Sequence, residues 1–235
     1  PQASIRVITS KDGKKWRSAS LISVPGVDLR DPKLSLTPKG DLMLLCGWRT
    51  WPPKKPRALK TCVCFSKDGF SWTEPRVILN GRWLWRATWH KGKAWGVAYG
   101  PVPDKKLKYG SALYTSSDGI NWEVVKQFSG WPGLTEATLR FGKDEVMYCF
   151  HRRDAGTSTA LLGFSKPPYK DWKFFDSGAY WGGPNMICYR GVWYAAGRRL
   201  EGGAKTVVGT IDWRNGKISP QLVLPSGGDT SYPGL

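Results

Sequence analysis

Hydrophobic residues along this chain come in short runs, and each run is followed by residues that form turns. From Thr135 onward the order is "TEATLRF", "GKD", "EVMYCFHRR", "DAGTST", "ALLGFS" and "PPYKDWKFF". The runs are rich in β-branched and aromatic residues, and no segment keeps the period of an amphipathic helix. The pattern therefore predicts an all-β chain of short antiparallel strands.

One motif, Ser-x-Asp-Gly-x-x-Trp, recurs in "ITSKDGKKWR", "CFSKDGFSWT" and "YTSSDGINWE", with a degenerate fourth copy in "FSKPPYKDW". The tryptophans that close the four copies are separated by 56, 50 and 50 residues, and they are Trp16, Trp72, Trp122 and Trp172. Units of four antiparallel strands at this period are typical of β-propeller blades. The sequence thus predicts a propeller of four-stranded blades.

We expect a single propeller domain over residues 1–235, with incomplete first and last blades. The chain enters at "SIRVITSKDGKKW", the pattern of a blade's last two strands, and stops at "SYPGL", where a new first strand begins. Its 235 residues, 40% of them hydrophobic, are enough for a sizeable core. No membrane span is expected, because no apolar run approaches about 20 residues.

The repeated Asp-Gly turn is expected to have a structural role. Ser and Asp side chains can bond the turn amides, and the Trp can pack between neighbouring blades. The ladder of carboxylates of a calcium loop is absent, and the two histidines and five cysteines have no zinc-binding spacing. We expect no metal and no cofactor. The cysteines lie in apolar runs, which favours buried free thiols over disulfides.

The chain is strongly basic, with 36 Lys and Arg against 18 Asp and Glu, a formal charge of +18 and a pI near 9.9. Such a charge attracts polyanions and indicates an acidic partner, although a solvated basic surface gives the same composition. Nucleic acid is a lower alternative, because tryptophans interleaved with lysines could stack on bases but no nucleic-acid motif is present. The oligomeric state stays open.

Polar residues recur at one position of the predicted first strands. The segments "RDPKLS", "WRATWH", "TEATLRF", "GGPNMIC" and "SYPGL" align so that one column holds Asp31, Arg86, Glu136, Gly183 and Tyr232. Because innermost strands converge around a propeller axis, this column predicts a binding or reacting site. The alternative is that these residues only cap strand ends in water.

Arginines recur on the strands that follow. In "MLLCGWR", "MYCFHRR" and "WYAAGRR" one column holds Arg49, Arg153 and Arg199, and the column before it holds Arg152 and Arg198. Guanidinium groups at strand ends are fork-shaped donors suited to a carboxylate or phosphate. We favour an anion site over the alternative of charges that only keep the strand ends soluble.

The strings "SKDGKKW", "SKDGFSW" and "SSDGINW" resemble the Asp boxes, or BNR repeats, of the sialidase (neuraminidase) superfamily, and the likeness covers nearly the whole chain. It implies a six-bladed propeller and a retaining exo-glycosidase that releases a terminal acidic sugar such as sialic acid. It also favours a secreted or periplasmic location, although the start of the given chain has no signal-peptide pattern.

The resemblance assigns roles to residues at matching positions. Tyr232 in "DTSYPGL" resembles the nucleophile, and Glu136 in "LTEATLRF" resembles the base that activates it. Arg152 and Arg198 resemble two of the three arginines that bind the sugar carboxylate, with Arg153 and Arg199 as neighbours that could replace them. A neutral phenol that Glu136 deprotonates can approach an anionic substrate, which would repel a carboxylate nucleophile.

The sequence departs from the family where the first blade should supply an arginine and a catalytic Asp. Arg30 and Asp31 in "VDLRDPKLS" are the candidates to replace them, and Arg86 and Asn185 are further candidates for substrate binding. Five-bladed glycosidases also have an Arg-Asp-Pro near a first strand, and the resemblance to them is weaker. The alternative function is a propeller that binds acidic glycans without catalysis.

Overall fold

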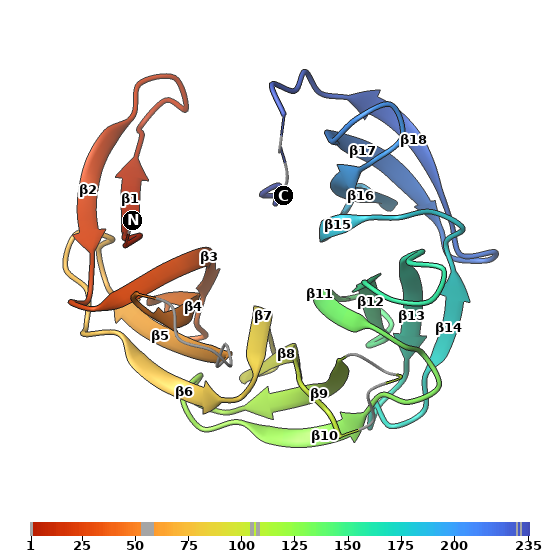
Figure 1. Cartoon of the computed structure of the whole chain (residues 1–235), viewed down its shortest axis with the longest axis horizontal. Coiled ribbons are helices and arrows are strands. Elements are labelled where there is room, and N and C mark those ends of the chain that lie inside the picture. The colour runs from red at the N-terminus through yellow and green to blue at the C-terminus, as the bar shows by residue number, and fades with distance from the viewer. Residues whose placement is uncertain (1, 53–58, 104–105, 107–108, 229, 231) are drawn as a thin grey trace. The chain divides into compact units, whose positions relative to one another are not determined.

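The described chain is all-β, as the sequence predicts. The computed structural model describes residues 2–52, 59–103, 106, 109–228, 230 and 232–235. Within these residues it has 18 β-strands and no α-helix. The strands form one two-stranded sheet and four four-stranded sheets, and in each sheet consecutive strands are neighbours (Figure 1). No helix of the described residues is long and apolar enough to cross a membrane.

The sheets follow one another along the chain. The two-stranded sheet consists of β1 (Ile5–Thr9) and β2 (Arg17–Ile22). The four-stranded sheets are β3 (Val27–Leu36), β4 (Leu42–Thr50), β5 (Lys60–Ser66) and β6 (Arg76–Asn80); β7 (Trp83–His90), β8 (Lys93–Gly100), β9 (Gly110–Ser116) and β10 (Glu123–Gln127); β11 (Leu134–Phe141), β12 (Met147–Arg153), β13 (Leu161–Ser165) and β14 (Lys173–Asp176); and β15 (Gly182–Tyr189), β16 (Val192–Arg199), β17 (Lys205–Asp212) and β18 (Lys217–Val223).

Contacts within the chain divide it into two compact units, residues 1–95 with 115–123 and residues 96–114 with 124–235. The first unit has a core that includes Ile5, Ile22, Leu29, Leu44 and Cys62. The second has a core that includes Phe150, Leu162, Trp181, Met186 and Val207. Each core is built from the hydrophobic runs that predicted the strands, because an apolar strand face is stable only when another apolar surface covers it.

Burial falls from the first strand of a sheet to the fourth. Six of the eight residues of β11 are buried, whereas β14 has none that is buried. The last sheet shows the same trend from β15 to β18. Glu136 on β11 and Asn185 on β15 are therefore held in the interior, where each polar group needs a partner.

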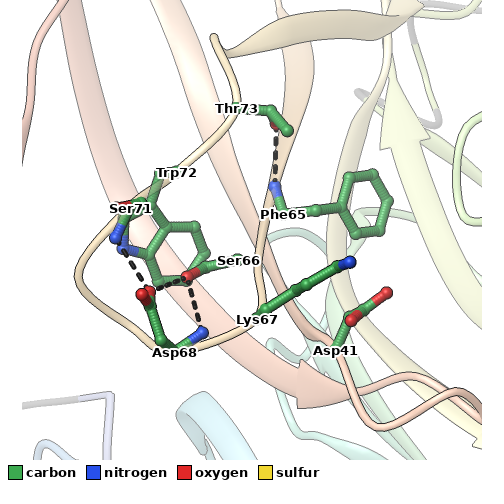
Figure 2. A pocket seen from close by; sticks show the side chains of 8 residues that line it. All are labelled: Asp41, Phe65, Ser66, Lys67, Asp68, Ser71, Trp72 and Thr73. Carbon is green, nitrogen blue, oxygen red and sulfur yellow. Dashed lines mark hydrogen bonds between the residues drawn. The ribbon is translucent and has the colours of Figure 1, made fainter.

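The first copy of the motif forms the turn between β1 and β2, and the other copies form the turn between the third and fourth strands of a four-stranded sheet. In the Asp-Gly copies the polar side chains bond the turn backbone. In the second copy Ser66 Oγ accepts from the Gly69 amide at 2.8 Å, and Asp68 Oδ1 accepts from the Phe70 amide at 2.8 Å. Asp68 Oδ1 also accepts from the Ser71 amide at 2.9 Å (Figure 2). The Trp72 indole donates to the Gly69 carbonyl at 3.0 Å. The first and third copies repeat these bonds.

This geometry confirms the structural role of the motif. The Ser71 and Phe70 amides lower the pKa of Asp68, because they hydrogen-bond its ionised form. The turn also lines a pocket together with Asp41 and Phe65 (Figure 2). The carboxylate and the hydroxyl of the motif bond the backbone of their own turn. The motif can therefore stabilise a turn wherever it occurs along the chain, which explains why it is reused.

The tryptophans of the motif differ in burial, which corrects the expectation that each packs between blades. Trp72 packs against the core of the first unit. Trp16 is 58% exposed. The bond from the indole to the turn carbonyl is present in both, so this bond and not burial is what the copies share. In the degenerate copy Trp172 donates to the Tyr169 carbonyl at 2.9 Å.

Two further expectations are wrong in part. Of the five cysteines, which are all free thiols, four are buried as predicted, but Cys188 is exposed on β15. The segment "SYPGL" was predicted to begin a strand, whereas its described residues 232–235 have no regular secondary structure. A strand needs a partner for its backbone groups, and the Pro233 nitrogen has no hydrogen to donate.

We predict that the turn glycines differ in how well they tolerate a side chain. Gly13 and Gly119 both have positive φ, 69° and 76°. A Cβ at Gly13 would meet nothing within 4 Å, whereas a Cβ at Gly119 would lie 3.0 Å from Met43 Sδ and 3.3 Å from the Trp89 ring. Gly13→Ala should cost about 1 kcal/mol of unfolding free energy through backbone strain, and Gly119→Ala about 1–2 kcal/mol more through overpacking. Urea unfolding measures both; equal losses would contradict the packing part.

Candidate active site

Three of the four-stranded sheets carry a β-bulge at the same place in the first strand. The register between first and second strands shifts between Arg30 and Lys33, between Leu134 and Ala137, and between Gly182 and Asn185. The bulged residues are Asp31 and Pro32, Thr135 and Glu136, and Gly183 and Pro184. A bulge redirects a side chain out of the regular pleat, and bulges are common next to active sites.

The bulges revise the predicted columns by one residue. Asp31 and Gly183 take the first bulge position and Glu136 the second, so the three are not strictly equivalent. Arg153 and Arg198 each lie opposite the residue just before a bulge, so Arg198 and not Arg199 corresponds to Arg153. Sequence alignment cannot show which residue a bulge absorbs, and this produced the error.

Glu136 is the buried carboxylate of the second unit. Its side chain is 7% exposed, and its Oε2 accepts hydrogen bonds from Arg152 Nη1 at 2.9 Å and from the Gly183 amide at 2.8 Å. The donors come from β12 and β15, so the carboxylate is held from two strands. Both bonds are made to Oε2, which leaves Oε1 as the oxygen that can exchange a proton.

Arg152 lies between two carboxylates. Its Nε donates to Asp154 Oδ1 at 2.8 Å, and its guanidinium carbon is 5.5 Å from the centre of the Tyr180 ring. Thr135 Oγ1 donates to the other oxygen of Asp154 at 3.2 Å, which closes a network around the bulge. The sequence reasoning missed Asp154, although it directly follows the two arginines in "HRRD".

Burial raises the pKa of Glu136, and the charge of Arg152 and the two hydrogen bonds oppose this shift. Burial opposes the protonated form of Arg152, but the charges of Glu136 and Asp154 raise its pKa overall. Arg152 therefore stays cationic. A buried carboxyl with a raised pKa is an environment in which acid or base catalysts are found.

His151 supports the bulge from behind. It is fully buried, lies opposite Ala137 and has its Nε2 3.2 Å from the Thr135 carbonyl, in the tautomer that donates to this oxygen. Burial lowers its pKa to about 3. A neutral imidazole thus fixes the backbone next to Glu136, which makes His151 a positioning residue.

The C-terminal segment is bound to the same region through Asn185. Asn185 Nδ2 donates to the Pro233 carbonyl at 3.1 Å, and Arg140 Nη2 donates to Asn185 Oδ1 at 3.1 Å. Asn185 is fully buried and lies on β15, the strand whose Gly183 amide binds Glu136. Pro233, which Asn185 contacts, directly follows Tyr232 in the sequence, so Tyr232 is next to a residue that contacts this strand. Tyr232 has a φ of 64° and is 39% exposed. Non-glycine residues adopt this backbone uncommonly, in turns or at strained sites.

Arg153 and Arg199 make ion pairs within the chain. Arg153 Nη2 is 2.9 Å from Asp176 Oδ2, and the same side chain donates to Thr157 and Thr159. Arg199 pairs with Glu201 and lies over the Trp181 ring. Because successive strand residues point to opposite faces, Arg152 and Arg153 face different surroundings, and so do Arg198 and Arg199.

The remaining candidates belong to the first unit. Asp31 lies in the β3 bulge with a φ of 54°, and Arg30 pairs with Asp28, a buried carboxylate that sequence reasoning missed. Arg86 lies half-buried on β7. Among the described residues no group of three His, Cys, Asp or Glu is placed to hold a metal ion.

No family model and no curated protein matches the sequence. Solved structures are similar at low identity. They include a protein of unknown function from Dyadobacter fermentans, with 17% identity over 96% of this chain and 74% of that protein at a TM-score of 0.81. A GH93 α-L-arabinofuranosidase of Fusarium graminearum with arabinobiose has 15% identity over 93% of this chain and 72% of its own, at a TM-score of 0.70.

A third similar structure is a GH43 β-xylosidase/α-arabinofuranosidase from a compost metagenome in complex with xylotriose. Its identity is 14% over 86% of this chain and 79% of its own, at a TM-score of 0.60. The likeness shows that this chain has the fold of the β-propeller glycoside hydrolases. The predicted propeller of four-stranded antiparallel blades is confirmed, and the count of six blades stays a prediction.

The buried imidazole predicts a loss of stability in mild acid. Below its usual pKa of about 6.5, His151 gains a proton in the unfolded chain but not in the folded one, whose pKa is about 3. Stability should therefore fall as the pH drops from about 6.5 towards 3, by about 1.4 kcal/mol per pH unit. Unfolding free energies are measured at pH 7 and at pH 5. The decrease between the two pH values should be about 2 kcal/mol smaller in His151→Gln than in the parent. An equal fall in both proteins would contradict it.

Proposed function

We propose that this propeller is a retaining exo-glycosidase that removes a terminal acidic sugar, with Tyr232 as nucleophile and Glu136 as its base. The observation that carries the proposal is the buried Glu136 carboxylate, held on Oε2 by Arg152 and Gly183 with Oε1 left for proton exchange. The fold shared with glycoside hydrolases and the Asp-box resemblance support the same class of reaction.

In the first step the Tyr232 phenol oxygen attacks the anomeric carbon while its proton passes to Glu136. The bond to the leaving group breaks, and the leaving oxygen takes a proton from a general acid, for which Asp31 is the replacement candidate that the sequence offers. In the second step the acid, now deprotonated, takes a proton from water as the water oxygen attacks the tyrosyl glycoside and displaces Tyr232, whose oxygen recovers the proton from Glu136. Two displacements at one carbon give net retention.

The environment of Glu136 suits a base for a phenol. A phenol has a pKa near 10, so a carboxylate removes its proton more readily when its own pKa is raised, as burial does for Glu136. Arg152 keeps the carboxylate ionised until the proton arrives. The contact between Asn185 and Pro233 supports a location of Tyr232 near this group.

The arginines give the proposal its acidic substrate. Arg198 lies opposite Gly182 at the end of β16, beside the bulge whose amide binds Glu136. Arg152 has donors beyond those used by Glu136 and Asp154, since a guanidinium has five N–H groups. The family resemblance assigns the substrate carboxylate to these two, although Arg198 corresponds in register to Arg153. We assign structural roles to Arg153 and Arg199, because each makes an ion pair within the chain.

We expect Tyr232→Phe and Glu136→Gln to lower turnover of an aryl α-sialoside by about a thousandfold or more, with little change in sugar affinity. Tyr189→Phe, at an exposed position of the same unit, and Glu123→Gln, at an exposed position of the first unit, are the matched controls and should keep parent activity. Release of the aryl group is the measurement. Equal turnover in Tyr232→Phe and parent would rule out the nucleophile.

We expect Arg198→Ala to raise the KM for the sialoside by about tenfold or more, because a charge-assisted contact to the carboxylate is lost. Arg214→Ala, which removes a highly exposed arginine of the same unit, should have no effect. Aryl α-L-arabinofuranoside and β-xyloside are the neutral substrates to compare. Cleavage of the neutral substrates alone would support the proposed glycosidase activity and contradict the proposed specificity for an acidic sugar.

A further inference from the structure

Two buried cysteines face each other across neighbouring strands of the first unit. Cys46 on β4 and Cys62 on β5 are direct partners in the antiparallel register, and their sulfur atoms are 2.9 Å apart. Both side chains belong to the core of this unit. The sulfurs are thus closer than two unbonded sulfur atoms usually approach, and they are joined by a thiol hydrogen bond.

The backbone at this position already suits a disulfide. Residues directly opposite each other in antiparallel strands have Cα atoms about 4.5–5.5 Å apart. A disulfide requires Cα atoms about 4.4–6.8 Å apart. A covalent bond between Cys46 and Cys62 therefore needs a small rotation of the side chains and no movement of the strands.

The other cysteines have no such partner. Cys64 lies opposite Leu44, Cys149 opposite Leu139 and Gly163, and Cys188 opposite Trp193. All five cysteines belong to the described residues, and the pair on β4 and β5 is the one in which two of them share a register position. Geometry thus selects one disulfide from the ten pairs that five cysteines allow.

We propose that Cys46 and Cys62 are a cross-linking site, joined by a disulfide when the chain folds in the presence of a small-molecule disulfide. One cysteine thiolate attacks the small disulfide and displaces half of it as a thiol. The second cysteine then attacks the mixed disulfide and displaces the other half. Two protein thiols are oxidised, one small disulfide is reduced to two thiols, and the two protein protons end on these thiols.

The cross-link has to form before the core closes. Cys46 is 3% exposed and Cys62 is fully buried, so a reagent cannot reach them in the folded chain. The facing Cys62 thiol, together with burial, raises the pKa of Cys46 and disfavours the thiolate that would react. The state of the pair should therefore record the redox conditions during folding and stay unchanged afterwards.

The disulfide would close a loop of residues 47–61, which comprises the end of β4, the connecting residues and the start of β5. Closing a loop of this length restricts the unfolded chain, so the oxidised protein should be more stable than the reduced one. The bond would also tie together the two central strands of the sheet whose first strand carries Asp31. The proposal does not depend on the proposed glycosidase activity.

The test is synthesis of the full chain in a cell-free system with either a glutathione redox buffer or excess dithiothreitol. Each product is denatured, alkylated and mapped by mass spectrometry. We expect a linked Cys46–Cys62 peptide in the first product alone, with Cys64 and Cys149 alkylated in both. Folded protein made with dithiothreitol, then transferred to oxidised glutathione, should still have Cys46 and Cys62 as thiols.

Variants separate the cross-link from general effects of cysteine loss. Cys149→Ala removes another buried thiol and should keep both the linked peptide and the higher melting temperature of the oxidised product. Cys46→Ala and the milder Cys46→Ser should lose both. Folded oxidative product in which Cys46 and Cys62 are alkylated, or in which other pairs link equally often, would overturn the proposal. Rapid oxidation of Cys46 and Cys62 in the folded reduced protein would overturn the inference that the disulfide forms only before the core closes.

Discussion

A buried carboxylate needs hydrogen-bond donors, and Glu136 obtains them from two different sheets. Arg152 belongs to the sheet of Glu136 itself, whereas the Gly183 amide belongs to the next one. A second bond between the same sheets runs from Thr138 Oγ1 to the Pro184 carbonyl at 2.7 Å. Breaking a buried ion pair from one side costs about 3–5 kcal/mol. The arrangement of the inner strands β11 and β15 therefore depends on the pairing of the Glu136 carboxylate. The same carboxylate is the base in the proposed reaction, so one group serves both the fold and the chemistry.

Features encoded within a few residues could be predicted from the sequence. The Ser-x-Asp-Gly-x-x-Trp turn is one, because all its bonds lie within seven residues. The short strands and the period of about 50 residues are others. The role of Arg153 could not be predicted, since its partner Asp176 is 23 residues away and on a different strand. Recurrence of arginines at strand ends indicated one anion-binding surface, but the pleat turns Arg152 and Arg153 to opposite sides.

The site itself could be predicted in outline. Glu136 was found because polar residues recur where strands should converge, and burial and pairing agree with a special role for it. His151 and Asp154 were not found, since nothing in a single sequence shows that an imidazole lies behind a bulge or that a carboxylate bridges Arg152 and Thr135. Both residues bond Thr135 in the bulge, and contacts of this kind are visible only after the strands are paired.

The degenerate fourth turn shows how a glycine can be replaced. Tyr169 keeps a φ of 64° where the other turns have Gly, yet its side chain is 7% exposed, its hydroxyl donates to the Glu145 carbonyl at 3.2 Å, and its ring meets Phe141 edge-on. Left-handed backbone costs about 1–2 kcal/mol, and a buried aromatic ring can offset it. For protein engineering, this means that a turn of this kind can be redesigned around a large side chain, provided that a carbonyl and an aromatic neighbour are supplied with it.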